Sequence, residues 1–221
     1  MNISNYQAIF FDCDGVILNS NKIKTQAFKS ATSEYEESLT NELISYHLSN
    51  GGISRYEKFN YFLSNIYPIS SDLKKKAALS NLLTLYSKYC LSELLNAEVT
   101  YGLKYFREIT YSIPWFIVSG GDQSELNYVF KEKSISKYFD GGIYGSPDSK
   151  DKIIKREIKR KDIRQPSLFL GDSKLDHQVS ILNGLDFIFV NKWTEFNSYK
   201  DYCKDHSIKI ISEVYDLCKD S

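Results

Sequence analysis

Cysteine is scarce in this sequence, and no two cysteines lie close together along the chain. The four cysteines are Cys13, Cys90, Cys203 and Cys218, and none of them belongs to a C-x-x-C pair. Structural zinc sites need closely spaced ligands, and disulfide frameworks need a higher density of cysteine. The spacing argues against a zinc module and against a disulfide-stabilised secreted domain. We therefore expect reduced thiols and a cytoplasmic location.

An excess of charge of either sign is also absent. Lys and Arg number 28, as do Asp and Glu, and the longest basic run is Lys74–Lys76. Proteins that bind nucleic acid usually carry a concentrated basic face, which this balance does not favour. No apolar stretch approaches the roughly 18 residues that a membrane span needs. We expect neither a nucleic acid nor a membrane as a partner.

What the sequence does contain is an alternation of apolar strand-like and helix-like segments. Residues 8–11 form a short apolar run that ends in polar residues, which is typical of a buried strand. Residues 21–95 show helical spacing, most clearly after the candidate N-caps Ser70 and Ser71. Further strands are predicted at 115–118, 142–144, 168–170, 187–190 and 208–211, and further helices at 103–109, 123–133, 150–160 and 173–183.

This order of elements predicts an α/β fold. Strands that alternate with helices favour a mostly parallel sheet covered on both faces. The long helical segment after the first strand predicts an insertion. We therefore expect a Rossmann-like parallel-sheet core, residues 1–17 and 97–221, with an inserted all-helical cap domain, residues 18–96.

Acidic or small residues follow three of the predicted strands. Asp12 and Asp14 follow the first strand, Ser119-Gly120-Gly121 follows the second, and Asp172 follows the fourth, with Asp176 nearby. In an open parallel sheet, ligands bind beyond the carboxyl ends of the strands. Carboxylates gathered there repel one another unless a cation lies among them, and an all-oxygen site favours Mg²⁺.

The order and spacing of these motifs resemble the haloacid dehalogenase superfamily, in its phosphatase and phosphomutase branch with a helical cap. Residues 10–20 resemble the first family motif, an apolar strand followed by D-x-D-G. Residues 116–120 are similar to the second motif, which ends in Ser or Thr, and residues 170–176 to the fourth, G-D-S-x-x-D. The resemblance covers nearly the whole chain.

The resemblance implies a role for each of these side chains. Asp12 is implied as the nucleophile that forms an aspartyl phosphate, and Asp14 as the general acid and base. Asp12, Asp172 and the backbone carbonyl of Asp14 are implied to bind Mg²⁺, with Asp176 in an outer or water-mediated position. Ser119 and the amides of Gly120 and Gly121 are implied to hold the phosphoryl oxygens.

Two further assignments follow from the same resemblance. The third family motif is a lysine at the start of a helix, and we assign it to Lys150, with Lys152 as the alternative. In the predicted cap, the segment that ends at Arg55 resembles a stretch whose arginine meets a second anionic group of the substrate. Lys58, one helical turn further, could join Arg55 there. His177 is predicted to be a boundary residue, and we name no partner for His47 or His206.

Three functions remain open at this point. The first is a Mg²⁺-dependent phosphatase acting on a small phosphorylated metabolite, either a sugar phosphate or a phosphorylated acid. The second is a sugar phosphomutase of the β-phosphoglucomutase type, which differs in transferring the phosphoryl group to a substrate hydroxyl rather than to water. The third is a receiver-like phospho-accepting domain, although such domains are shorter and lack the insertion. A small phosphorylated molecule is the expected partner, and we expect a monomer or weak dimer.

Overall fold

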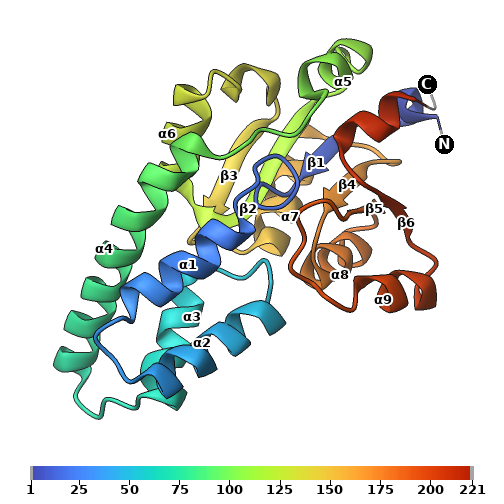
Figure 1. Cartoon of the computed structure of the whole chain (residues 1–221). Helices are drawn as coiled ribbons and strands as arrows, with labels where there is room; N and C mark the ends of the chain where they lie inside the picture. Colours follow the sequence, from blue (N-terminus) through green and yellow to red (C-terminus); the bar gives the residue numbers. More distant parts are fainter. Residues whose placement is uncertain (1, 220–221) are drawn as a thin grey trace.

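The computed structural model describes residues 2–219, and its centre is one parallel sheet of six strands (Figure 1). Their order across the sheet is β3-β2-β1-β4-β5-β6. The strands are β1 (Ile9–Phe11), β2 (Trp115–Asp122), β3 (Gly142–Ser146), β4 (Leu168–Gly171), β5 (Asp186–Val190) and β6 (Lys209–Ile211). All six coincide with predicted strands, so the predicted α/β parallel sheet is confirmed.

Helices cover both faces of the sheet. They are α5 (Leu103–Ile109), α6 (Gln123–Glu132), α7 (Lys150–Lys161), α8 (Lys174–Leu182) and α9 (Tyr199–Asp205), with 3-10 turns at Ile3–Asn5, Ser136–Tyr138 and Val214–Cys218. The central strands are buried on both sides, which is why they are continuous apolar runs. Phe10 and Phe116 pack toward α7 and α8, whereas Phe11 and Trp115 pack toward α5 and α6.

Four helices occupy the segment between β1 and α5, at the lower left of Figure 1. They are α1 (Asn21–Ala31), α2 (Glu37–Ser49), α3 (Arg55–Tyr61), which continues into a π-helical turn (Phe62–Ile66), and α4 (Asp72–Asn96). The hydroxyl of Ser71 caps α4, as the sequence predicts. Leu18 forms an antiparallel bridge with Val99, so the chain leaves the sheet and returns to it at neighbouring points.

Some elements differ from the predictions. The strand predicted at 115–118 continues to Asp122, with a shift in its pairing to β3 after Val118. Helix α9 and the turn Val214–Cys218 were not predicted. Helix α9 buries only Cys203 and therefore lacks the apolar stripe by which a helix is recognised.

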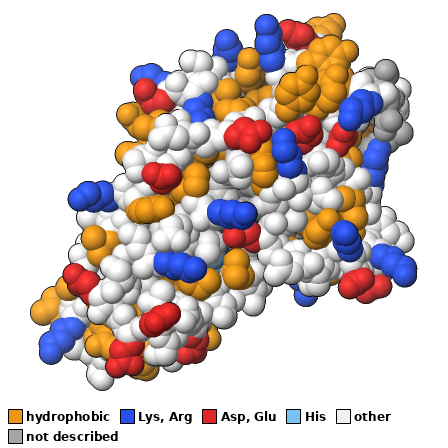
Figure 2. Space-filling model, in the orientation of Figure 1, with side chains coloured by type: hydrophobic (Ala, Val, Ile, Leu, Met, Phe, Trp, Pro, Cys, Tyr) orange, Lys and Arg blue, Asp and Glu red, His pale blue; other side chains and the backbone are white. Residues whose placement is uncertain are grey.

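The surface agrees with the balanced composition. On the face shown in Figure 2, basic and acidic side chains are interspersed rather than gathered by sign. Across residues 2–219, no helix has both the length and the apolar character required to cross a membrane.

Candidate active site

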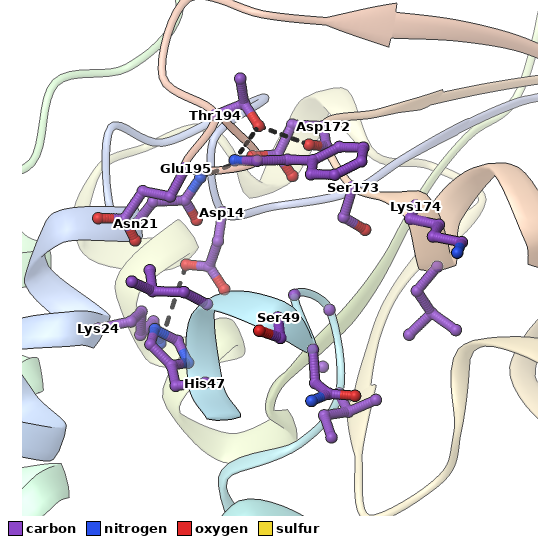
Figure 3. Close-up of a pocket in the computed structure, with 18 of the residues that line it drawn as sticks. Asp14, Asn21, Lys24, His47, Ser49, Asp172, Ser173, Lys174, Thr194 and Glu195 are labelled. Atoms are coloured by element: carbon purple, nitrogen blue, oxygen red, sulfur yellow. Dashed lines mark hydrogen bonds and ion pairs between the residues drawn. The ribbon is translucent and has the colours of Figure 1, made fainter. Parts of the chain in front are cut away.

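The carboxyl ends of β1, β2 and β4 bring three distant parts of the chain together. Because β1 pairs with both β2 and β4, Asp12, Ser119 and Asp172 lie on adjacent strand ends. A pocket of about 870 Å³ opens between these ends and helices α1 to α4. Asp12 is part of its wall on the sheet side. Figure 3 shows Asp14 and Asp172 on the same side, with Lys24 and His47 from the helical insertion.

Three buried carboxylates form the floor of this region. Asp12, Asp172 and Asp176 each present an oxygen, and these oxygens all lie within 4.8 Å of one another. The Lys150 ammonium lies 2.8 Å from Asp12 Oδ2 and 2.6 Å from Asp176 Oδ1. The predicted Asp12, Asp172 and Asp176 therefore do converge, and Lys150 is the lysine that contacts Asp12 and Asp176.

The electrostatics of this group suit a divalent cation. Burial raises the pKa of Asp12 to about 7, although the Lys150 charge opposes the rise. Burial also raises the pKa of Asp172 well above its ordinary value, and the neighbouring Asp12 and Asp176 add to the effect. Three carboxylates share a single ammonium, so an additional positive charge would stabilise their ionised form. The residues present therefore fit a bound metal ion.

Asp176 is held more firmly than the other two. One oxygen accepts from Lys150, and the other accepts from the Ser173 backbone N–H (3.2 Å) and hydroxyl (2.6 Å). Ser173 in turn caps the N-terminus of α8. Both oxygens of Asp176 are therefore bonded within the chain, and its outer position at a metal stays a prediction.

Asp14 lies outside this carboxylate group and faces the pocket. Its Oδ1 accepts a hydrogen bond from the Ser20 hydroxyl at 2.5 Å, and Lys24 Nζ lies 3.9 Å away. The side chain retains 20% of its exposure, whereas that of Asp12 retains 4%. An acid that reaches the pocket can exchange a proton with a bound molecule.

The small residues of β2, Ser119 to Gly121, lie beside the carboxyl end of β1. Ser119 is fully buried, and its Oγ accepts a hydrogen bond from the Gly121 N–H at 2.9 Å. A Cβ on Gly120 would overlap the backbone carbonyl of Gly52, so the helical insertion approaches β2 closely here. Gly120 and Gly121 line the pocket, whereas Ser119 lies beneath it and accepts from the Gly121 amide. Their binding of a phosphoryl group stays a prediction.

Gly15 and Asn21 hold Asp172 in place. Asn21 Nδ2 donates to Asp172 Oδ2 (2.6 Å) and to the Trp193 carbonyl (2.9 Å). Gly15 has φ +79°, a conformation that costs other residues strain, and a Cβ there would overlap Asp172 Oδ2. The glycine of the D-x-D-G motif is therefore required both by the turn and by the carboxylate beside it.

Replacing Gly15 with Ala should destabilise the protein by about 2–4 kcal/mol, because left-handed strain adds to an overlap with Asp172. Gly184→Ala is a matched control, since Gly184 has φ +65° but open space where its Cβ would be. That control should lose about 1 kcal/mol. Urea unfolding of both variants measures the difference, and equal losses would mean that Asp172 does not press on Gly15.

In the helical insertion, Arg55 forms an ion pair with Glu125 of this chain. Its guanidinium makes two hydrogen bonds to Glu125 of α6, at 2.6 and 3.1 Å, and one to Ser87 of α4 at 2.9 Å. It also lies over the Tyr86 ring, 4.7 Å from the centroid. Lys24 bonds the same Glu125 at 3.0 Å. Arg55 lines the pocket as expected, but a carboxylate of this chain occupies its guanidinium.

Lys58 and His47 belong to a series of polar contacts that continues through Thr25 to Glu195. Lys58 Nζ lies 2.7 Å from His47 Nδ1, and Thr25 Oγ1 lies 2.9 Å from His47 Nε2. Thr25 donates to Glu195 Oε2 at 2.7 Å. His47, for which the sequence indicates no partner, is therefore a buried residue of the pocket wall.

Other predictions concern residues outside the pocket floor. Lys152 forms an exposed ion pair with Asp148 at 2.8 Å and takes no part in the carboxylate group. His177 contacts the Tyr202 hydroxyl at 2.8 Å and packs on Phe187, which agrees with a boundary position.

Sequence reasoning did not identify Asn21, Lys24, Glu125 or Glu195 as site residues. No local signal marks Asn21, Lys24 and Glu195. Glu125 lies in the first turn of α6, where an acidic residue is ordinary. Only the tertiary fold brings Asn21, Lys24 and Glu195 to the pocket. The same fold places Glu125 against the cations Lys24 and Arg55.

Comparison with known proteins gives a family and a fold. A family model described as haloacid dehalogenase-like hydrolase matches residues 6–176. None of the curated proteins matches the chain.

Several solved structures share the architecture at low identity. A predicted phosphatase from Clostridium acetobutylicum superposes with a TM-score of 0.73 at 19% identity, covering 97% of each chain. A β-phosphoglucomutase from Clostridium difficile gives 0.71 at 18% identity, covering 96% of this chain and 93% of that one. A predicted phosphoglycolate phosphatase from Haemophilus somnus gives 0.72 at 14% identity, covering 99% of each. At these identities the likeness shows the shared fold.

Proposed function

The chain belongs to the haloacid dehalogenase-like hydrolases, and we propose that it is a Mg²⁺-dependent phosphatase of a small phosphorylated metabolite, either a sugar phosphate or a phosphorylated acid. The observation that carries this proposal is the buried group of Asp12, Asp172 and Asp176, with Lys150 bonded to Asp12, beside a large pocket. Membership in a hydrolase family favours an enzyme over the receiver-like alternative.

In the proposed reaction, Asp12 is the nucleophile. One of its carboxylate oxygens bonds to phosphorus as the bond between phosphorus and the leaving oxygen breaks. Asp14 gives its proton to that leaving oxygen. In the second half, Asp14 takes a proton from a water molecule that attacks the aspartyl phosphate, which frees inorganic phosphate and restores Asp12. Phosphate monoesters hydrolyse very slowly without catalysis, and the covalent intermediate divides the barrier into two smaller ones.

The surrounding residues supply charge and position. Lys150 offsets negative charge beside Asp12, and Ser119 with the amides of Gly120 and Gly121 would hold the phosphoryl oxygens. Asp12, Asp172 and the backbone carbonyl of Asp14 would hold Mg²⁺. The ion would offset the negative charge of Asp12 and of the phosphate, so that the two can approach.

The helical insertion supports a second candidate, a sugar phosphomutase. The insertion covers the site, because Gly51 and Gly52 pack on Ser173 and Leu175 and the Gly52 carbonyl lies against Gly120. A covered site can exclude water and so favour transfer to a substrate hydroxyl. We keep the division into a core (1–17 and 97–221) and a cap (18–96) as part of this proposal. The cytoplasmic location and the monomeric or weakly dimeric state also stay predictions.

The proposal is tested with a panel of phosphorylated sugars, sugar acids and nucleotides. With Mg²⁺ we expect at least one compound to release inorganic phosphate, the release to stop when a chelator removes the metal, and added Mg²⁺ to restore it. Formation of an isomerised sugar phosphate without free phosphate would favour the mutase. Turnover that persists in chelator would contradict metal dependence, and no reaction with any compound would contradict both functions.

A further inference from the structure

Lys58 is a buried lysine whose ammonium contacts no carboxylate among the described residues. The residue is 3% exposed, and its Nζ contacts His47 Nδ1 at 2.7 Å and the His47 carbonyl at 3.5 Å. Within residues 2–219, no carboxylate oxygen lies within 4.0 Å of Lys58 Nζ. Burying an unpaired ammonium is costly, so the position needs an explanation.

The neighbouring His47 does not supply that charge. Because Thr25 Oγ1 donates its proton to Glu195, it must accept from His47 Nε2, which therefore carries the imidazole hydrogen. His47 Nδ1 is then the acceptor for Lys58. Burial, together with the charges of Lys58 and Lys24, lowers the pKa of His47 to about 2. The imidazole is therefore neutral and only orients the ammonium.

The other two cations of the pocket wall are compensated. Arg55 and Lys24 share Glu125, and Lys24 also lies 3.9 Å from Asp14. These two positive charges thus face two carboxylates. Nη1 and Nη2 of Arg55 are both bonded to Glu125, which closes this end of the guanidinium to a substrate anion.

Lys58 and His47 line the same pocket as Asp12 and Asp14. Burial lowers the pKa of Lys58 to about 7, as expected for an ammonium that lacks an anion at short range. An anion bound in the pocket would hold Lys58 in its charged form and remove the cost of its burial. One ammonium without a carboxylate in contact matches a singly charged carboxylate better than a second, dianionic phosphate.

We propose that Lys58, oriented by His47, binds a carboxylate on the leaving-group side of the substrate, and that Arg55 ties the helical insertion to α6 instead of binding substrate. The substrate class is then a phosphorylated carboxylic acid. This inference rests on the proposed phosphatase function, which it makes more specific.

The test uses substrate pairs that differ only in the carboxylate, 3-phosphoglycerate with glycerol 3-phosphate, and phosphoglycolate with 2-hydroxyethyl phosphate. The wild type should favour the acid of a pair by roughly tenfold or more in kcat/KM. Lys58→Gln keeps a donor to His47 but removes the charge, and it should abolish that preference mainly through KM for the acid. Lys58→Arg, which restores a charge, should recover part of the preference.

Two comparisons make the result specific to Lys58. Lys76→Gln removes an exposed lysine of α4 and should keep the wild-type preference. Arg55→Gln should lower kcat/KM for acid and alcohol by the same factor, because it loosens the contact with α6. A wild type without preference, an equal effect of Lys58→Gln on both members of a pair, or loss of preference in Arg55→Gln alone would each overturn the proposal.

Binding of phosphonates separates this inference from the proposed function. Calorimetry with 3-phosphonopropionate and 3-hydroxypropylphosphonate needs no turnover, since their carbon–phosphorus bonds are not hydrolysed by this chemistry. If no phosphate ester is hydrolysed but the carboxylate analogue binds more tightly in a manner that depends on Lys58, the subsite stands and the phosphatase proposal fails. If esters are hydrolysed but the two phosphonates bind equally, the phosphatase stands and the subsite fails.

Discussion

Asp12→Asn should abolish turnover while leaving the protein folded. The amide is a very poor nucleophile, so the expected loss in kcat is roughly four orders of magnitude or more. The fold should persist because the change removes one of three adjoining buried carboxylates and so reduces their repulsion. Lys150 would keep its contact with Asp176 at 2.6 Å. Phosphate release under saturating substrate, together with a urea unfolding curve, measures both parts of the prediction.

Asp162→Asn provides the control for Asp12→Asn. Asp162 follows α7, and its side chain is 91% exposed. Asn is well tolerated at its left-handed backbone position, so activity and stability should match those of the wild type. Turnover of the Asp12 variant above about one per cent of the wild-type rate would refute the assignment of Asp12 as nucleophile.

Lys150→Met should damage both stability and catalysis. The ammonium is 2% exposed and bonds Asp12 and Asp176, so its removal leaves buried carboxylates without their cation. Breaking such a pair typically costs about 3–5 kcal/mol. The pKa of Asp12 should rise further without Lys150, which favours the neutral form of the nucleophile at neutral pH. We expect kcat to fall by roughly a hundredfold or more.

The stability of the Lys150 variant should depend on pH in a defined direction. Without Lys150, the folded-state pKa of Asp12 would lie further above its unfolded value, so protonation of Asp12 favours the folded state. The loss relative to wild type should therefore be largest at pH 8 and smaller at pH 5, as measured by urea unfolding in the absence of metal. A loss independent of pH would mean that uncompensated carboxylate charge is not its cause.

Lys152→Met is the matched control for Lys150→Met. The two lysines are two residues apart on α7, and Lys152 is 71% exposed in a surface pair with Asp148. Surface pairs contribute about 0–1 kcal/mol, so this variant should retain nearly full stability and activity. If it lost as much activity as the Lys150 variant, the assignment of the motif lysine would be wrong.

The contrast between these two lysines shows where sequence reasoning stops. Both follow the same cap residue, Ser149, within the first turn of α7. The spacing of apolar residues does not tell which of these two lysines faces the sheet, because both lie in the first turn of α7. The burial of Lys150 follows from the angle at which α7 packs on the strands, and that angle is a property of the tertiary structure.

In the helical insertion, too, the charge pairing of Arg55 and Lys58 is not visible in the order of the sequence. The sequence marks Arg55 by its place in a glycine-rich segment, but nothing near it indicates that Glu125, 70 residues later, will bond its guanidinium. The sequence indicates Lys58 only through its place one helical turn after Arg55. That no carboxylate contacts its ammonium is visible only once every neighbour is placed. Electrostatic pairing depends on distance in space, so a sequence read in order does not contain it directly.

By itself the sequence determined the six strands and the convergence of Asp12, Asp172 and Asp176. It could do so because buried parallel strands are continuous apolar runs, and because the carboxyl ends of such strands meet at one edge. The tertiary structure alone decided which lysine reaches Asp12, which two cations pair with Glu125 and which cation contacts no carboxylate. Those outcomes depend on how helices from distant parts of the chain pack, since the energy of a charge is set by all the groups around it.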